Sequence, residues 1–183
     1  MGLPNALSLF RIAMVPVLGA LAWLGEPTLF LYGLAASLLS DVVDGYVARR
    51  SGAVSALGAR LDSLGDLATY TTLPLFAWWL WPGTLRQEKT AFLLAAVAYL
   101  VPIGFGWMRF RRLTSYHTWA AKLTAVWMGG ALLVLFGGGP VWPFHVGVAL
   151  LVLEAAEEIA ITCVLPAWKN DVPTLWHALR MPR

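Results

Sequence analysis

Four aspartates form two close pairs in the first half of the chain. Asp41 and Asp44 are three residues apart, and Asp62 and Asp66 are four apart. In helices these spacings put both members of each pair on one face. Carboxylates repel one another in apolar surroundings unless cations neutralise them, and their hard oxygen atoms suit Mg²⁺ or Mn²⁺, which bind phosphates in turn. The aspartates therefore predict a divalent-metal site that handles a phosphate-bearing substrate.

Small and basic residues accompany the aspartates. Gly45 and Ala48 would let a ligand approach the backbone closely, because neither has a bulky side chain. Arg49 adds a permanent cation about one helical turn beyond Asp44. The alternative is that the acids are solvated or pair only with nearby arginines, namely Arg49, Arg50 and Arg60. The apolar segments on both sides of the stretch argue against that alternative, so we expect a ligand site.

The same residues match the spacing of a known signature. The stretch reads Asp-x2-Asp-Gly-x2-Ala-Arg-x8-Gly-x3-Asp-x3-Asp, formed by Asp41, Asp44, Gly45, Ala48, Arg49, Gly58, Asp62 and Asp66. It resembles the motif of the CDP-alcohol phosphotransferase (CDP-alcohol phosphatidyltransferase) family, with no position missing. So many fixed residues at fixed spacings rarely arise by chance. The resemblance implies a membrane transferase that uses a CDP-linked substrate.

The resemblance also implies a role for each motif residue. Asp41, Asp44 and Asp62 would bind divalent metal that bridges the diphosphate of the donor. Asp66 would be the catalytic base for the acceptor hydroxyl and a further metal contact. The substrate-binding residues of the motif would be Gly45 and Ala48 at the cytidine, Arg49 at a phosphate, and Gly58.

The chemistry of such a transfer independently requires these parts. An acceptor hydroxyl attacks the phosphorus that carries the alcohol group, and CMP leaves. Metal neutralises the diphosphate and the charge that develops on the leaving phosphate, and a carboxylate takes the hydroxyl proton. No covalent enzyme intermediate is needed, and no serine, cysteine or histidine stands in an obvious nucleophile setting.

The elements that must position these residues are apolar helices. Hydrophobic residues make up 59% of the 183 residues, above the ~45–50% of soluble domains, and the mean hydropathy is +0.69. Six stretches are long enough to cross a bilayer, and they cover residues 7–24, 29–47, 57–81, 91–108, 119–136 and 143–165. We therefore expect an all-α integral membrane bundle of six transmembrane helices, in a single domain that covers residues 1–183.

The distribution of basic residues predicts how the bundle is oriented. With the amino terminus in the cytoplasm, the outside segments hold only Arg86 and Lys89. The inside segments hold Arg11, Arg49, Arg50, Arg60, Arg109, Arg111, Arg112, Lys122, Lys169, Arg180 and Arg183. By the positive-inside rule, both termini are cytoplasmic, which predicts the cytoplasmic (inner) membrane and an active site that faces the cytoplasm. The net charge of +3 then reflects topology and anionic lipid rather than nucleic acid.

The opening of the chain provides a further candidate. Pro4 and Asn5 stand at the expected start of the first helix, with Arg11 within two turns, and this opening is similar to one common in the family. Asn5 is expected either to cap the helix or to bind substrate. Arg11 is expected either to snorkel to the membrane interface or to touch the ligand.

Charged residues of the later helices form two further groups. The basic group, at the inner ends of the fourth and fifth predicted helices, is Arg109, Arg112 and Lys122. By its position in the family, this group is expected to bind an acceptor phosphate. The acidic group is Glu154, Glu157 and Glu158, which share one helix face. These acids are expected to pair with the basic residues of the fourth and fifth helices, and a third metal site is the alternative.

Two features near the carboxyl terminus complete the expectations. Cys163 is the single cysteine, so an internal disulfide is excluded, and we expect it to be buried as a small hydrophobe. Residues 168–180 have apolar side chains at helical spacing beside basic ones, interrupted by Pro173. They predict an amphipathic segment at the membrane interface.

The predicted reaction transfers a phosphatidyl group from CDP-diacylglycerol to the hydroxyl of a small polar acceptor, in phospholipid biosynthesis. Glycerol 3-phosphate is the preferred acceptor, as in phosphatidylglycerol phosphate synthases, although those often have Asp-Lys where this chain has Asp66-Leu67. The alternatives within the family are phosphatidylserine and phosphatidylinositol phosphate synthases. Those outside it are a membrane prenyltransferase and a non-catalytic lipid- or ion-binding protein. The resemblance also implies a homodimer.

Overall fold

The computed structural model describes residues 3–51, 56–112, 116, 118–169 and 172–180. Within these ranges the description covers the backbone alone at residues 3–8, 41–42, 44–51, 56–64, 66–67 and 70. The described residues form eight helices, and their contacts divide the chain into two compact units, Met1–Gln87 and Glu88–Arg183. The single domain over residues 1–183 stays a prediction.

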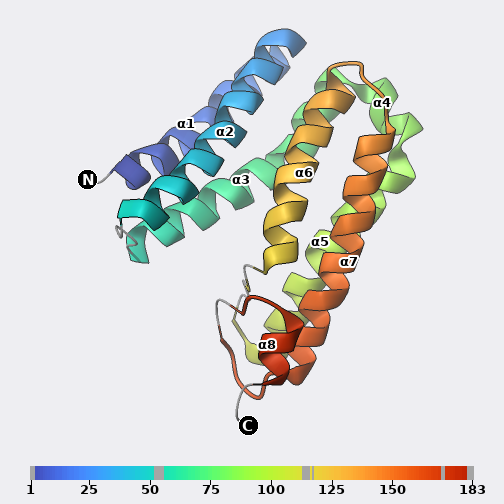
Figure 1. Ribbon diagram of the computed structural model, residues 1–183. Coiled ribbons are helices and arrows are strands. Elements are labelled where there is room, and N and C mark those ends of the chain that lie inside the picture. Colours follow the sequence, from blue (N-terminus) through green and yellow to red (C-terminus); the bar gives the residue numbers. More distant parts are fainter. Residues whose placement is uncertain (1–2, 52–55, 113–115, 117, 170–171, 181–183) are drawn as a thin grey trace. The chain divides into compact units, whose positions relative to one another are not determined.

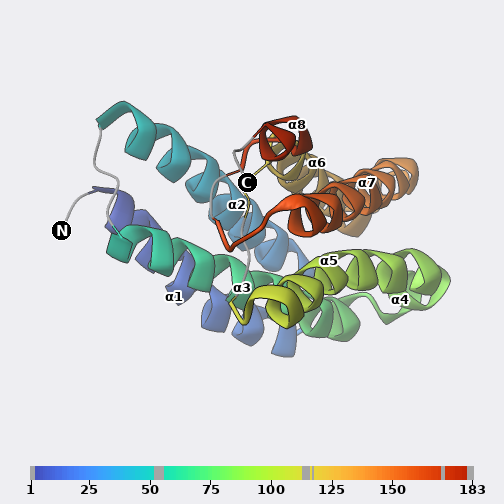
Figure 2. The same cartoon turned by 90° about the horizontal axis from the view of Figure 1, so that it is seen from below.

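The first unit contains three long helices and one short one. They are α1 (Leu3–Trp23), α2 (Pro27–Ser51), α3 (Ala56–Leu80) and α4 (Pro82–Gln87). α1 packs against both α2 and α3. The start of α1, the end of α2 and the start of α3 lie at the same end of this unit (Figures 1 and 2). This end therefore brings together segments that are far apart in the sequence.

A glycine turn reverses the chain between α1 and α2. Gly25 has a φ of +72°, a conformation that glycine adopts without steric cost. The Glu26 N–H donates to the Leu21 carbonyl at 3.0 Å, and the Gly25 N–H donates to the Ala22 carbonyl at 3.2 Å, which is the pattern of a Schellman cap. Pro27 then opens α2, where its missing N–H costs no helical hydrogen bond. The sharp reversal makes α2 antiparallel to α1.

The central helix of the second unit is α7. The unit contains α5 (Lys89–Phe110), α6 (Trp119–Phe136), α7 (Trp142–Val164) and α8 (Leu175–Leu179), and α7 packs against the other three. α8 lies at the end of α7 (Figures 1 and 2). A buried cluster holds this end together, formed by Tyr116, Ile161, Leu165, Val172 and Ala178.

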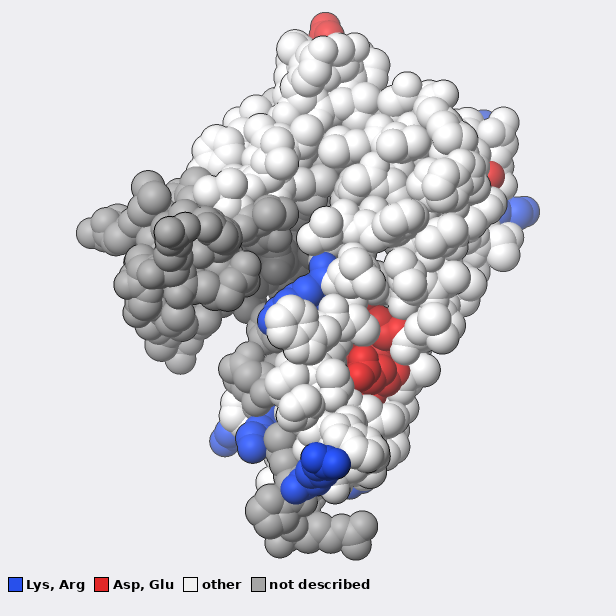
Figure 3. Space-filling view, viewed as in Figure 1, with Lys and Arg blue, Asp and Glu red and all other residues white. Residues whose placement is uncertain are grey.

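Two helices of the second unit, α5 and α6, are long and apolar enough to cross a membrane, by length and composition. Only 17% of the most apolar part of α5 and 28% of that of α6 is buried in the protein. Figure 3 shows that charged side chains are sparse on the described surface in this view. Exposed apolar surface on this scale marks a membrane or protein contact, and it supports the predicted membrane protein. The other four crossings and the cytoplasmic termini stay predictions.

The six predicted stretches coincide with the six long helices and differ from them mainly at the ends. α1 begins at Leu3, so Asn5 lies inside the helix, and its prediction as the cap is wrong. The short helix α4 lies between two of the predicted stretches, where no helix was expected, because Pro82 is suited to a first helical turn.

The carboxyl-terminal expectations have mixed outcomes. Cys163 is exposed rather than buried, because its neighbours Ile161 and Thr162 take the inward-facing positions of α7. In α8, Ala178 is buried whereas Trp176 and Leu179 are exposed. The segment is amphipathic as predicted, and its place at a membrane interface stays a prediction.

Candidate functional site

The motif residues lie in two helices of the first unit. Asp41, Asp44, Gly45, Ala48 and Arg49 belong to α2, and Gly58, Asp62 and Asp66 belong to α3. α2 continues to Ser51, about two turns beyond Asp44, so the first pair lies inside the helix and not at its predicted end. The side chains of the motif lie outside those that the structure describes. Their roles as ligands, base and substrate contacts therefore stay predictions.

Close contacts at glycines fix the register of these helices. A methyl group on Gly33 of α2 would lie 3.0 Å from the Leu18 side chain and 3.1 Å from that of Met14. A methyl group on Gly65 of α3 would lie 3.7 Å from the Ile12 side chain and 3.6 Å from Arg11 Nε. α2 thus runs antiparallel to α1, and α3 runs parallel to it.

This register brings one aspartate of each pair to the same level of the unit. Since the three helices rise equally per residue, Asp41 and Asp62 both come about level with Ser8 of α1. By the same extension, Asp44 and Gly58 come about level with Asn5. These positions lie toward the end of the unit where α2 ends and α3 begins (Figure 1). Helix packing alone therefore gathers backbone positions that are remote in the sequence.

Arg11 is buried beside the second aspartate pair. Its side chain is 3% exposed, and its Nη2 atom lies 3.7 Å from the position that a Cβ of residue 65 would take. The guanidinium therefore points toward α3, and the snorkelling alternative is wrong. The other expectation, a contact between Arg11 and the ligand, stays a prediction. A cation inside an apolar stretch is costly unless it faces a polar partner.

The donor set of the motif fits a hard divalent cation. Four carboxylates supply the oxygen ligands that Mg²⁺ and Mn²⁺ prefer, and the register places their backbone positions at one end of three packed helices. Among the residues whose side chains are described, no group of three or more His, Cys, Asp or Glu residues could hold a metal ion. The metal prediction therefore rests on the motif.

Arg109 of the predicted phosphate-binding group caps a helix. Its Nη2 atom donates to the carbonyl oxygens of Cys163 at 3.3 Å and of Leu165 at 3.4 Å. These carbonyls belong to the end of α7, where helical partners are missing. Arg109 therefore joins the carboxyl ends of α5 and α7, a role that the sequence did not indicate.

The other two basic residues of that group lie over aromatic rings. The Arg112 guanidinium is 5.0 Å from the ring centroid of Trp168, and the Lys122 ammonium is 5.0 Å from that of Trp119. Both contacts are cation–π interactions. The three residues of the group have separate partners, so a shared phosphate pocket stays a prediction.

The glutamates of α7 do not make the predicted ion pairs. The Glu157 carboxylate accepts the N–H of Leu175, the first residue of α8, at 3.0 Å. Glu154 forms a hydrogen bond with the side chain of Thr124 in α6. In the described part of the chain, no ion pair joins these acids to Arg109, Arg112 or Lys122. The pairing is wrong because the basic residues contact carbonyl groups and aromatic rings instead.

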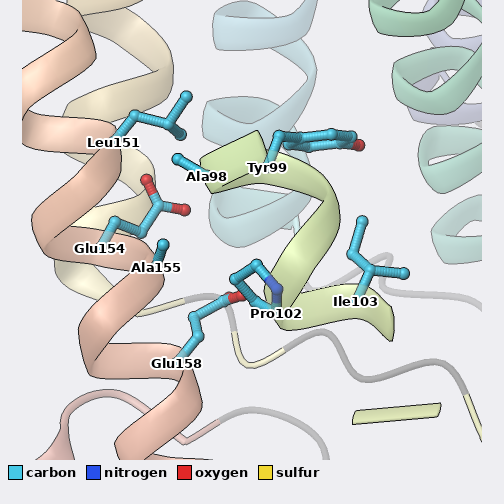
Figure 4. Close-up of a pocket in the computed structure, with 8 residues that line it drawn as sticks. All are labelled: Ala98, Tyr99, Pro102, Ile103, Leu151, Glu154, Ala155 and Glu158. Atoms are coloured by element: carbon cyan, nitrogen blue, oxygen red, sulfur yellow. The ribbon is translucent and has the colours of Figure 1, made fainter. Parts of the chain in front are cut away.

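Glu154 and Glu158 line a small cavity between α5 and α7 (Figure 4). Its volume is about 160 Å³, and its other lining residues are Ala98, Tyr99, Pro102, Ile103, Leu151 and Ala155. This volume is well below the ~300–1,000 Å³ of sites for drug-sized ligands. The cavity is therefore too small for a CDP-linked lipid, and it does not compete with the motif as the donor site.

Tyr116 is a structural residue that the sequence did not reveal. Its hydroxyl lies 2.8 Å from Thr162 Oγ1, and the Thr162 hydroxyl donates to the Glu158 carbonyl at 2.9 Å. Since that proton is engaged, Tyr116 is the donor to Thr162. Burial raises the pKa of the Tyr116 phenol, which keeps it protonated as a donor. The bond ties the segment before α6 to α7.

Comparisons with known proteins agree with the motif. CDP-diacylglycerol--serine O-phosphatidyltransferase of Methanocaldococcus jannaschii is 45% identical over 40 residues, which are 22% of this chain and 20% of that protein. The cardiolipin synthases (CMP-forming) of Rattus norvegicus and Homo sapiens are each 42% identical over 65 residues, which are 35% of this chain and 22% of each synthase. The chain thus spans about a fifth of the length of these curated relatives. No solved structure matches it significantly.

The family comparison covers most of the chain. The family described as CDP-alcohol phosphatidyltransferase matches residues 1–168. This range contains all the motif residues and reaches into both units. The chain therefore belongs to the CDP-alcohol phosphatidyltransferase family of enzymes.

Proposed function

We propose that this protein transfers a phosphatidyl group from CDP-diacylglycerol to the hydroxyl of a small polar acceptor and releases CMP. The observation that carries the proposal is the family match over residues 1–168, which includes the complete motif. The names of the relatives support the donor and the leaving group of this reaction. One is a CDP-diacylglycerol-dependent transferase, and the others are CMP-forming.

The residues of the motif have different roles in this reaction. Asp41, Asp44 and Asp62 would hold Mg²⁺ or Mn²⁺, and the bound metal supplies positive charge at the diphosphate. Asp66 takes the proton of the acceptor hydroxyl. The hydroxyl oxygen forms a bond to the phosphorus that carries the diacylglycerol, and the bond from this phosphorus to the CMP oxygen breaks. Gly45, Ala48, Arg49 and Gly58 bind the donor.

Glycerol 3-phosphate is the proposed acceptor. Arg109, Arg112 and Lys122 supply positive charge in the second unit, and a phosphomonoester carries about −1.5 to −2 charges near neutral pH. The relatives provide alternatives. One relative is a serine O-phosphatidyltransferase by name. A cardiolipin synthase that forms CMP must accept phosphatidylglycerol, because removal of one phosphatidyl group from cardiolipin leaves that lipid. The proposal includes a homodimer in the cytoplasmic membrane, with the motif facing the cytoplasm.

The test is an assay of the full chain in detergent with CDP-diacylglycerol and Mn²⁺. The acceptor panel contains glycerol 3-phosphate, serine, inositol phosphate and phosphatidylglycerol, with CMP and the lipid product both identified by mass spectrometry. Glu26→Gln is the matched control, because Glu26 is an exposed acid of the first unit outside the motif. We expect CMP and phosphatidylglycerol phosphate to form in equal amounts. If the folded protein released no CMP with any acceptor, the proposal would fail in favour of a prenyltransferase or a non-catalytic protein.

A further inference from the structure

Four pairs of a tryptophan and a cation lie at one end of the second unit. The Arg111 guanidinium lies 5.1 Å from the ring centroid of Trp107, and the Arg180 guanidinium lies 4.4 Å from that of Trp176. The other two pairs, described above, are Arg112 with Trp168 and Lys122 with Trp119. All four cations are exposed. We call these four pairs the basic rim.

Hydrogen bonds show that the segments of the basic rim belong to the same end of the unit. Arg109 joins the carboxyl ends of α5 and α7. The Trp119 N–H donates to the Pro173 carbonyl at 3.1 Å, and the Leu175 N–H donates to the Glu157 carboxylate at 3.0 Å. The start of α6 and the start of α8 are thus both tied to this end. Figure 3 shows Lys and Arg side chains gathered toward it, in the lower part of the view.

The tryptophans of the basic rim are unusually accessible. Trp107, Trp119 and Trp176 are 49%, 68% and 59% exposed. Trp107 lies near the end of α5 and Trp119 begins α6, and these are the two helices long and apolar enough to cross a membrane. Indole rings at the ends of such helices are typical of the membrane interface, where the ring meets apolar chains and the N–H meets water. The basic rim therefore fits the level of phospholipid headgroups.

The charge of the basic rim is directed outward, whereas the glutamates of α7 are engaged elsewhere. Glu157 binds the α8 backbone, and Glu154 and Glu158 line the cavity between α5 and α7. A guanidinium that lies over a ring uses its flat face, so the N–H groups at its edge can still bind phosphate oxygens. A zwitterionic headgroup brings its own cation, whereas an anionic headgroup has net charge that complements the basic rim. Charge complementarity therefore favours an anionic phospholipid as the occupant.

We propose that the basic rim binds the headgroup phosphates of anionic phospholipids and selects these lipids over zwitterionic ones. The tryptophan rings lie at the boundary with the acyl chains, and the cations bind the phosphate oxygens. This binding does not depend on the transfer reaction. Arg111 and Arg180 lie outside the predicted acceptor group, so they test the basic rim separately from that group.

The experiment measures quenching of tryptophan fluorescence by brominated lipids in nanodiscs that hold the full chain. The host lipid is phosphatidylcholine, and a minor fraction is brominated phosphatidic acid or brominated phosphatidylcholine. Phosphatidic acid is the anionic probe because it is not on the acceptor panel. We expect phosphatidic acid to quench wild type more strongly at equal mole fraction, with a preference that falls at high salt. Equal quenching by the two lipids would overturn the proposal, as would loss of the preference to inorganic phosphate at constant ionic strength.

Two double variants with the same loss of charge test the cations. Each basic residue near an anionic surface contributes about fivefold to binding, so Arg111→Gln/Arg180→Gln should lower the relative affinity for phosphatidic acid by on the order of twentyfold. Arg86→Gln/Lys89→Gln is the matched control, because both residues are exposed and lie before or at the start of α5, away from the basic rim. It should keep the wild-type preference. Wild-type affinity in the first variant, or an equal loss in both, would contradict the basic rim.

Two tryptophan variants locate the bound lipid without any change of charge. Trp176 of the basic rim is 59% exposed, and Trp142, which begins α7 at its other end, is 60% exposed. Trp176→Phe should remove part of the quenching that is specific to phosphatidic acid, whereas Trp142→Phe should leave that part unchanged. This comparison decides the proposal even if Arg111→Gln/Arg180→Gln does not fold. Equal effects of the two variants would mean that anionic lipid has no preferred place on the protein, and the proposal would be wrong.

Discussion

The Arg109 guanidinium donates to the carbonyl oxygen of Cys163 at 3.3 Å, so a cation at the end of α5 caps the end of α7. Carbonyl groups at a helix terminus carry partial negative charge and attract cations. Arg109 therefore has a structural task that is independent of any acceptor. The Lys122 ammonium, by contrast, lies over the ring of Trp119. In the described contacts, its side chain does not cap a helix end.

This difference predicts separate effects for the two substitutions. Arg109→Ala should lower thermal stability in detergent and impair donor and acceptor kinetics together. Lys122→Ala should raise the KM for glycerol 3-phosphate about tenfold with unchanged stability, because a hydrogen bond to a charged group contributes about 1.5–3 kcal/mol. Lys89→Ala is the control, since Lys89 is an exposed lysine at the other end of α5. An unchanged KM in Lys122→Ala, or a wild-type preference for serine, would reject the phosphate pocket without affecting the family assignment.

Metal removal should abolish turnover. With the metal chelated, the carboxylates repel the diphosphate that they otherwise bind through Mg²⁺ or Mn²⁺. We expect CMP release to stop in excess chelator and to return when either ion is added back. Ca²⁺ is the informative comparison, because it is larger and takes more ligands. Full activity in excess chelator would contradict the metal site.

The sequence predicted the helices well because their signals are local. Apolar stretches of sufficient length, punctuated by Gly25 and Pro27 and by Pro82, place the long helices and most of their ends. The motif was equally visible, because it is defined by residue types at fixed spacings. These parts depend on neighbours in the sequence and not on tertiary contacts.

The contacts that were missed connect distant segments. Arg109 reaches Cys163, Tyr116 reaches Thr162, and Glu157 reaches the backbone at residue 175. Charge patterns favoured ion pairs between the basic residues and the glutamates, but helix ends offer carbonyl and N–H groups that also need partners. A sequence does not show which unpaired backbone group will lie beside a given side chain.

Substitutions within the aspartate motif should separate chemistry from binding. Asp66→Asn removes the proton acceptor and retains most of the donor site, so kcat should fall by at least about a hundredfold with donor affinity largely unchanged. Asp62→Asn should weaken Mn²⁺ binding and CDP-diacylglycerol binding together, because it removes a metal ligand. Donor and metal binding are measured by calorimetry, with Glu26→Gln as the control. Near-normal turnover in Asp66→Asn would show that another group is the base.

The bond from Tyr116 to Thr162 should stabilise the second unit without affecting catalysis. Tyr116→Phe keeps the ring in its buried position and removes only the hydroxyl, and Thr162 still donates to the Glu158 carbonyl. A neutral hydrogen bond contributes about 0.5–1.5 kcal/mol, so Tm in detergent should fall by about 2–4 °C. Tyr32→Phe is the matched control, because Tyr32 is 70% exposed and its loss should leave Tm unchanged. If Tyr116→Phe lowered kcat at unchanged Tm, the hydroxyl would belong to the reaction and not to the packing of α7.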